Sequence, residues 1–201
     1  MMCVMNSDVE DVLKEYKIKN YSVNRTGTVD VTGDVDMSRM NLASLPVKFR
    51  RVTGNFYCRR NELVSLENAP WFVGGTFICD SNALISLIGG PRYVGGDFGC
   101  AENRLETLEG GPEEVGGRYR CETNRLVSLR GVPKELHNHF YCQDNPDLAS
   151  VRGLGVVNGE FHCYGTKLAA HMEEIKRTGV VPIFLLHDRR PRGIPSKNLA
   201  S

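Results

Sequence analysis

The feature that most constrains this chain is a repeat with a period of 21 residues. Six of the seven cysteines recur at this interval. An aromatic residue stands two positions before each of them, and an asparagine stands three positions after five of them. A fixed period in this range is typical of stacked repeats, in which each unit buries its apolar edge against its neighbours. The side chains expected to form this continuous interior are Phe56, Cys58, Asn61, Phe77, Cys79, Asn82, Phe98, Cys100, Asn103, Tyr119, Cys121, Asn124, Phe140, Cys142, Asn145, Phe161 and Cys163.

Within each unit, the aromatic residue and the cysteine alternate with variable positions, which predicts a β-strand. Cysteine serves in such a stack as a small apolar filler. The asparagine follows the strand, where its amide is expected to hydrogen-bond backbone groups left unpaired inside the bend. Paired glycines such as Gly74-Gly75 predict a tight corner, and prolines without a helical pattern predict an extended convex side.

The segment F-x-C-x-x-N-x-L matches the L-x-L-x-x-N-x-L pattern, so the chain resembles leucine-rich-repeat proteins over roughly residues 32 to 170. Its short unit, with proline before the closing aliphatic residue, looks most like the compact repeats of bacterial effector ligases. No length remains for the large catalytic domain of those ligases. The repeat is also similar to uncharacterised repeat proteins of tailed bacteriophages. The resemblance implies a repeat solenoid, a leucine-rich-repeat-like parallel β-stack, and a viral factor acting on a host protein.

The two ends of the chain are expected to cap this stack. Residues 1–31 are predicted to form an N-terminal cap with a helix over 8–19 and a β-hairpin over 21–31. Residues 32–178 would hold about seven units of 21 residues, the last merging into a capping helix at 167–177. Residues 179–201 are predicted to be a strand-like apolar segment followed by a basic, flexible tail.

Composition and motifs exclude several classes of function. The net charge is +1, which does not favour nucleic acid or a membrane surface. The chain shows neither a signal-like start nor an apolar run of roughly 20 residues, so a soluble, cytoplasmic protein is expected. The sequence holds no C-x-x-C metal spacing, phosphate-loop context or nucleophile with a placed base. We therefore expect no metal, no cofactor and no enzymatic activity. Neighbouring cysteines would lie about 4.8 Å apart, so disulfide pairing stays open on distance alone, although reduced core cysteines explain the pattern.

The positions that the repeat does not dictate are the candidates for binding. They flank the aromatic residue and the cysteine on each strand and are expected to line a concave face. Tyrosine and arginine, which are enriched at interaction hot spots, occur among them. A plainly solvated face is the alternative interpretation. The candidate partner-binding residues are Tyr57, Arg59, Ile78, Asp80, Asp97, Arg118, Arg120, Glu122, His139, Tyr141, Gln143, His162 and Tyr164.

The leading hypothesis is a monomeric protein-interaction module that binds a protein partner on this concave face. A bacteriophage factor of this kind would inhibit or redirect a host protein in the host cytoplasm. One alternative is a nucleic-acid-binding protein that uses the basic tail and the concave arginines, although acidic residues lie among them. The other is a structural component that associates with itself through the ends of the solenoid. The arginines of the nucleic-acid alternative are Arg59, Arg60, Arg118 and Arg120, and the opposing acids are Asp80, Asp97 and Glu102.

Overall fold

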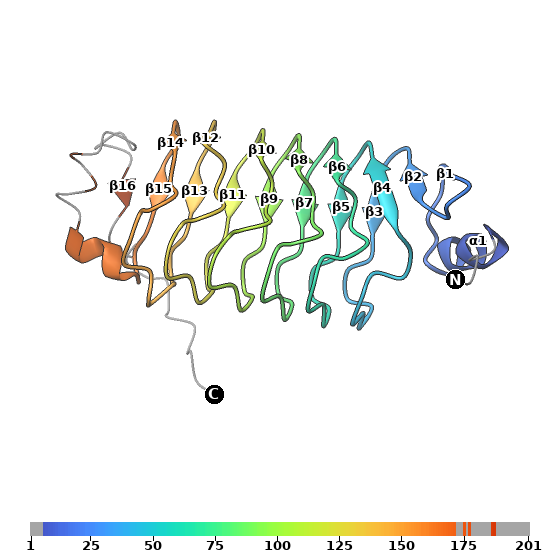
Figure 1. Cartoon of the computed structure of the whole chain (residues 1–201), viewed down its shortest axis with the longest axis horizontal. Helices are drawn as coiled ribbons and strands as arrows, with labels where there is room; N and C mark the ends of the chain where they lie inside the picture. The colour runs from blue at the N-terminus through green and yellow to red at the C-terminus, as the bar shows by residue number, and fades with distance from the viewer. Residues whose placement is uncertain (1–5, 172–174, 176, 178–185, 188–201) are drawn as a thin grey trace.

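The computed structural model describes residues 6–171, 175, 177 and 186–187, and within them the chain is a parallel β-solenoid (Figure 1). Strand partners in successive turns stand 21 residues apart, as in the pairing of Phe56 with Phe77. The predicted repeat stack is therefore confirmed. The turns follow one another in a nearly straight row in Figure 1, with two rows of strands above a row of loops.

The strands predicted around the aromatic residue and the cysteine form one column. They make an eight-stranded sheet in which each strand pairs in parallel with the next turn. Each strand is short, because a bend follows the cysteine. In sheet order from the N-terminal end, the members are β3 (Val35–Asp36), β5 (Phe56–Tyr57), β7 (Phe77–Ile78), β9 (Phe98–Gly99), β11 (Tyr119–Arg120), β13 (Phe140–Tyr141), β15 (Phe161–His162) and β16 (Leu186–His187).

A second column of strands runs along the side that the sequence predicted to be merely extended. Here a buried aliphatic residue such as Val73 alternates with a partly exposed neighbour, which is a strand pattern too short to be recognised from sequence. The six-stranded sheet contains β1 (Tyr21–Val23), β2 (Val29–Val31), β4 (Phe49–Val52), β6 (Phe72–Val73), β8 (Tyr93–Val94) and β10 (Glu114–Val115). Beyond it, β12 (Glu135–Leu136) and β14 (Val156–Val157) form a separate parallel pair.

The interior consists of columns of like side chains. The rings of Phe56 and Phe77 stack at 5.4 Å, and those of Phe140 and Phe161 stack at 5.6 Å. The six periodic cysteines are free and buried. The Sγ of Cys79 donates a hydrogen bond to the Gly99 carbonyl at 3.2 Å. Burial raises the pKa of this thiol well above its ordinary value, so it stays protonated and acts as a weak donor.

The periodic asparagines hydrogen-bond backbone groups of two successive turns. Asn145 is fully buried; its Oδ1 accepts from Leu126 N at 3.0 Å, and its Nδ2 donates to the carbonyls of Cys121 and Cys142 at 3.1 and 2.9 Å. The residue before each asparagine adopts left-handed backbone, which ends the strand and turns these groups inward. These left-handed residues are Arg60, Ser81, Glu102, Thr123 and Asp144. The asparagine column thus satisfies the groups that the bend leaves unpaired.

The paired glycines allow adjacent turns to approach closely at the corner between the two sheets. A Cβ on Gly95 would stand 2.2 Å from the carbonyl oxygen of Gly74, and a Cβ on Gly116 would stand 2.3 Å from that of Gly95. No side chain fits at these distances. Close approach, rather than unusual backbone dihedrals, therefore requires glycine here.

The N-terminal cap has a shorter helix than predicted. Helix α1 spans Asn6–Glu15 instead of 8–19, because Lys17 is left-handed with a φ of 57°. The amide of Ile18 donates to Leu13 O and that of Lys17 to Lys14 O, which is the Schellman pattern that terminates helices. The predicted hairpin is confirmed: β1 and β2 pair antiparallel and turn at Gly27, which has a φ of 75°.

At the C-terminal end, the helix predicted over 167–177 begins as a 3₁₀ helix, Lys167–His171, and residues 175 and 177 are α-helical. At this end the asparagine column also stops. Thr166 stands in the asparagine position, and its hydroxyl donates one hydrogen bond, to Cys163 O. The apolar segment ends in β16, which pairs with β15. Residues 180–185 and the tail from 188 lie outside the described residues, as does Cys3. In the part of the chain that the structure describes, no helix is both long and apolar enough to cross a membrane.

Candidate functional site

The outward side of the eight-stranded sheet, here called the eight-stranded face, carries the candidate binding residues. Side chains one turn apart stand in columns, since the strands are in parallel register. Most candidates are partly or fully exposed there. They are Tyr57, Arg59, Asp80, Asp97, Arg118, Arg120, Glu122, His139, Tyr141, Gln143 and His162.

Two candidates are buried instead, so their prediction as exposed binding residues is wrong. Ile78 and Tyr164 are each only 8% exposed. Ile78 lies over the space that Gly99 leaves empty, since a Cβ on Gly99 would stand 2.9 Å from Ile78 Cδ1. Tyr164 follows β15, the strand on which β16 pairs at this end of the sheet. The burial of Ile78 therefore depends on the small residue that the neighbouring turn has at Gly99.

The centre of the eight-stranded face is occupied by an ion-pair cluster. Arg120 lies 2.7 Å from a carboxylate oxygen of Glu122 and 3.5 Å from one of Asp80, which stands two strands away. This reach crosses Gly99 and the buried Ala101, where no large side chain obstructs it. The guanidinium of Arg120 is therefore committed to two internal carboxylates.

The Asp80 carboxyl is largely withdrawn from water. Its Oδ1 accepts a hydrogen bond from Ala101 N at 2.9 Å, and its side chain is 15% exposed. Burial raises the pKa of Asp80 from 3.8 to about 6, although the positive charge of Arg120 opposes this shift. The folded protein therefore binds a proton at Asp80 more tightly than the unfolded chain does.

Replacing Asp80 with asparagine is expected to stabilise the protein at neutral pH. A carboxyl whose folded pKa is raised costs stability above that pKa, so stability falls as pH rises from about 4 to about 6. The variant should gain about 1–3 kcal/mol at pH 7.5 and nothing at pH 3.5, measured by urea unfolding. An Asp147→Asn control, at a carboxyl that is 63% exposed, should show little gain. Equal stability of the wild type and Asp80→Asn at both pH values would contradict a raised pKa of Asp80 in the folded protein.

An aromatic cluster lies at the C-terminal end of the same face. The rings of Tyr141 and His162 stack at 4.6 Å, and His139 meets Tyr141 edge-on at 6.2 Å. Glu160 fixes both histidines: its carboxylate lies 2.9 Å from His162 Nε2, and its amide donates to His139 Nδ1 at 3.0 Å. The Tyr141 ring is partly exposed and held in place before any partner arrives.

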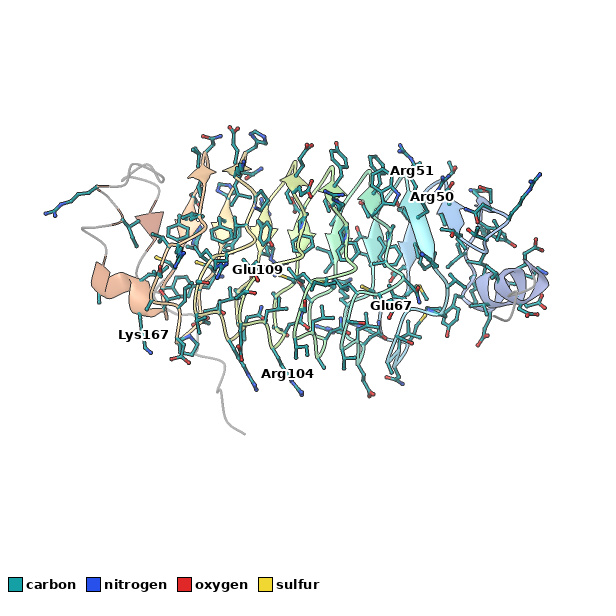
Figure 2. The ribbon with its side chains drawn as sticks, viewed as in Figure 1. Arg50, Arg51, Glu67, Arg104, Glu109 and Lys167 are labelled. Carbon is teal, nitrogen blue, oxygen red and sulfur yellow. The ribbon has the colours of Figure 1, made fainter. Side chains whose placement is uncertain are left out.

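A second candidate surface, which was not predicted from the sequence, is the outward side of the six-stranded sheet and of β12 and β14, here called the six-stranded face. The guanidinium of Arg51 lies 3.8 Å from the ring centre of Phe72, which stacks on Tyr93 at 4.9 Å. Trp71 stands beside this stack and is 49% exposed. Figure 2 shows Arg51 and its neighbour Arg50 on this upper side of the solenoid. The available signal was the aromatic residue directly before the closing valine in two successive units.

A cleft of about 1070 Å³ opens on this face beside Tyr93. Its charged lining includes Glu114, Lys134 and Glu135. Within the described residues, no group of three or more His, Cys, Asp or Glu side chains could hold a metal ion. The arrangement on both faces suits recognition of a larger molecule through aromatic and charged side chains.

These features define the chain as a parallel β-solenoid with two differentiated outward faces. No protein-family model, curated protein or solved structure matches it. Its class therefore rests on its own geometry.

Proposed function

We propose that this protein is a non-enzymatic interaction module that binds a protein partner on the eight-stranded face. The observation that carries the proposal is the partly exposed cluster of Tyr141, His139 and His162, which β13 and β15 hold in a fixed arrangement. A rigid tyrosine loses little conformational entropy on binding, and tyrosine is among the residues enriched at hot spots. Arg118 stands directly before β11, the strand beside β13, and its exposed side chain supplies a charged contact.

The mode of action that fits this surface is binding that covers part of the partner's own surface. A short solenoid that covers part of a partner acts as an adaptor or an inhibitor. The resemblance to bacteriophage repeat proteins supports the form in which the partner is a host protein in the host cytoplasm. The nucleic-acid alternative has less support, because Arg120 is held by Asp80 and Glu122 and is not free to meet phosphate.

Site-specific photocrosslinking inside the source cell tests this proposal. A benzophenone amino acid at Tyr141 should crosslink to a single protein, whereas the same group at Arg104 should not. Arg104 is exposed and points away from both sheets in Figure 2. Crosslinks from Arg104 alone, or crosslinks to nucleic acid from Tyr141, would contradict the proposal.

Affinity measurements with the captured partner then test whether the side chains of Tyr141 and Arg118 contribute to binding. Tyr141→Ala with Arg118→Ala should weaken binding at least about tenfold, since hot-spot truncations cost about 2 kcal/mol or more. The unfolding midpoint should stay close to that of the wild type, because both side chains contact solvent. Arg120 is left intact in this experiment, since its loss would leave the carboxylates of Asp80 and Glu122 without their positive partner. Unchanged affinity of the double variant would move the interface elsewhere.

A further inference from the structure

The six-stranded face already contains an arginine packed on an aromatic ring. Arg51, Phe72 and Tyr93 occupy successive strands in register, and the guanidinium, the first ring and the second ring form one continuous stack. The next position in the same column is Glu114, which pairs with Tyr93 in the backbone register. One end of the aromatic pair thus carries a cation of the chain itself, and the other end borders a carboxylate.

The cleft beside Tyr93 exists because the glycine column of the corner stops. Gly74, Gly95 and Gly116 pack against the preceding turn so closely that a Cβ would stand 2.2–2.3 Å from a backbone oxygen. His137 takes this position in the following turn and cannot approach in the same way. The strand pairing of the six-stranded sheet correspondingly ends at β10, and β12 pairs only with β14. The interruption leaves the hollow between these turns.

The cleft is lined by four glutamates and by one lysine, Lys134, so its lining is acidic. Two of the lining glutamates form ion pairs within the chain, Glu113 with Arg92 and Glu109 with Arg130. Glu135 accepts a hydrogen bond from Asn158 Nδ2 at 3.0 Å. For Glu114, the described part of the chain shows no ion pair or hydrogen bond of its carboxylate, and the side chain is exposed at the rim.

A buried hydroxyl lies beneath one wall of the same cleft. Tyr119 is the one tyrosine among the six periodic aromatic residues, and its Oη is buried without a hydrogen-bond partner among the described residues. A Cβ on Gly111, which lines the cleft, would stand 3.2 Å from this oxygen. An unpartnered buried hydroxyl is unfavourable, so a polar ligand group that reached Tyr119 Oη past Gly111 would gain a hydrogen bond there.

We propose that this cleft binds an arginine side chain of an extended segment of a protein partner. A guanidinium on Tyr93 continues the stack that Arg51 begins on Phe72, and Glu114 accepts its N–H groups. Arginine suits the site better than lysine because its planar guanidinium both stacks on a ring and donates in a fork to a carboxylate. The surface is separate from the eight-stranded face, so it is a second contact region that does not depend on the function proposed above.

Peptide titrations followed by NMR test the proposal on the full chain. The probes are three pentapeptides, Gly-Ser-Xaa-Ser-Gly, with arginine, lysine or citrulline as Xaa. The arginine peptide should shift the amides of Gly110, Gly111 and Gly116. The lysine peptide should bind at least about fivefold more weakly, and citrulline, which lacks the charge, should not bind measurably. Equal binding of arginine and citrulline peptides, or shifts confined to the eight-stranded face, would overturn the site.

Variants separate the ring, the carboxylate and the hydroxyl. Tyr93→Leu should lower affinity at least about fivefold, whereas Tyr93→Phe keeps the ring and should bind as the wild type does. Glu114→Gln should weaken binding and reduce its salt dependence, while the matched control Glu106→Gln, on an exposed loop position, should change neither. Full affinity of Tyr93→Leu or Glu114→Gln overturns the proposal.

The buried hydroxyl behind Gly111 is tested by Tyr119→Phe. Weaker binding with an unfolding midpoint at or above that of the wild type supports the hydroxyl as a contact of the ligand. Full affinity overturns that contact. The Tyr141→Ala variant should bind the arginine peptide normally, so failure of this site and failure of the eight-stranded face are distinguishable.

Discussion

Replacing Asn103 with alanine is expected to destabilise the protein by about 1–3 kcal/mol for each buried backbone group that loses its partner. Its Oδ1 accepts from Leu84 N at 3.0 Å, and its Nδ2 donates to the carbonyls of Cys79 and Cys100 at 3.1 Å. Asn103 is 9% exposed, so water cannot readily replace these bonds. Because one amide serves two turns, the loss should be several-fold larger than for an ordinary surface substitution.

Urea unfolding combined with native-state hydrogen exchange measures this effect. Exchange should accelerate most in the turns on either side of Asn103, since each turn of a solenoid is stabilised by its neighbours. Asn55→Ala is the matched control: that side chain accepts one bond, from Thr76 N, at a partly exposed position. The control should cost less than about 1 kcal/mol. A wild-type unfolding curve for Asn103→Ala would show that the amide column does not stabilise the stack.

Substitution of Gly95 by alanine should destabilise the protein, whereas a glycine-to-alanine change that the backbone permits stabilises it. Such a change usually stabilises a protein by about 0.4–1 kcal/mol where the backbone permits it, because it restricts the unfolded chain. At Gly95 the new methyl group would stand 2.2 Å from the carbonyl oxygen of Gly74, a backbone atom that cannot move without separating the two turns. We expect a loss of more than about 4 kcal/mol or failure to fold.

Thermal unfolding and soluble yield measure this prediction. Gly99→Ala provides the control, since the atoms nearest to its methyl group would belong to side chains, Asp80 Oδ1 at 2.8 Å and Ile78 Cδ1 at 2.9 Å. Side-chain ends can shift at a lower cost than the backbone of a neighbouring turn, so a loss below that of Gly95→Ala is expected. If Gly95→Ala unfolds at the wild-type temperature, the corner does not require glycine and the explanation of the cleft at His137 fails with it.

The interior of the stack could be predicted from sequence because the period repeats there without much variation. Once Phe98 and Cys100 are placed in one turn, parallel stacking fixes where Phe77 and Cys79 must lie. The same logic predicted the asparagine bonds, since the bend recurs at one position in every unit. The binding faces could not be predicted in this way, because their side chains differ from turn to turn.

The failures at Ile78 and Tyr164 have a physical cause of this kind. Alternation along one strand assigns both residues to the outward side, and this assignment is correct for the direction of the backbone. Exposure, however, also depends on neighbouring segments: Gly99 leaves room that Ile78 fills, and Tyr164 is buried at the end where β16 pairs with β15. A pattern within one unit contains no information about the size of the side chain one period away.

The sequence by itself determined the 21-residue unit, the strand around each aromatic residue and cysteine, the asparagine bend and the glycine corner. These follow from local alternation and from the need to bury apolar side chains and pair the backbone, which every unit meets identically. The tertiary structure alone decided the second sheet, the ion pair of Arg120 with Asp80 two strands away, and the cleft where His137 interrupts the glycines. Each of these depends on side-chain length and on empty space across neighbouring turns, and these become defined only when the turns are stacked.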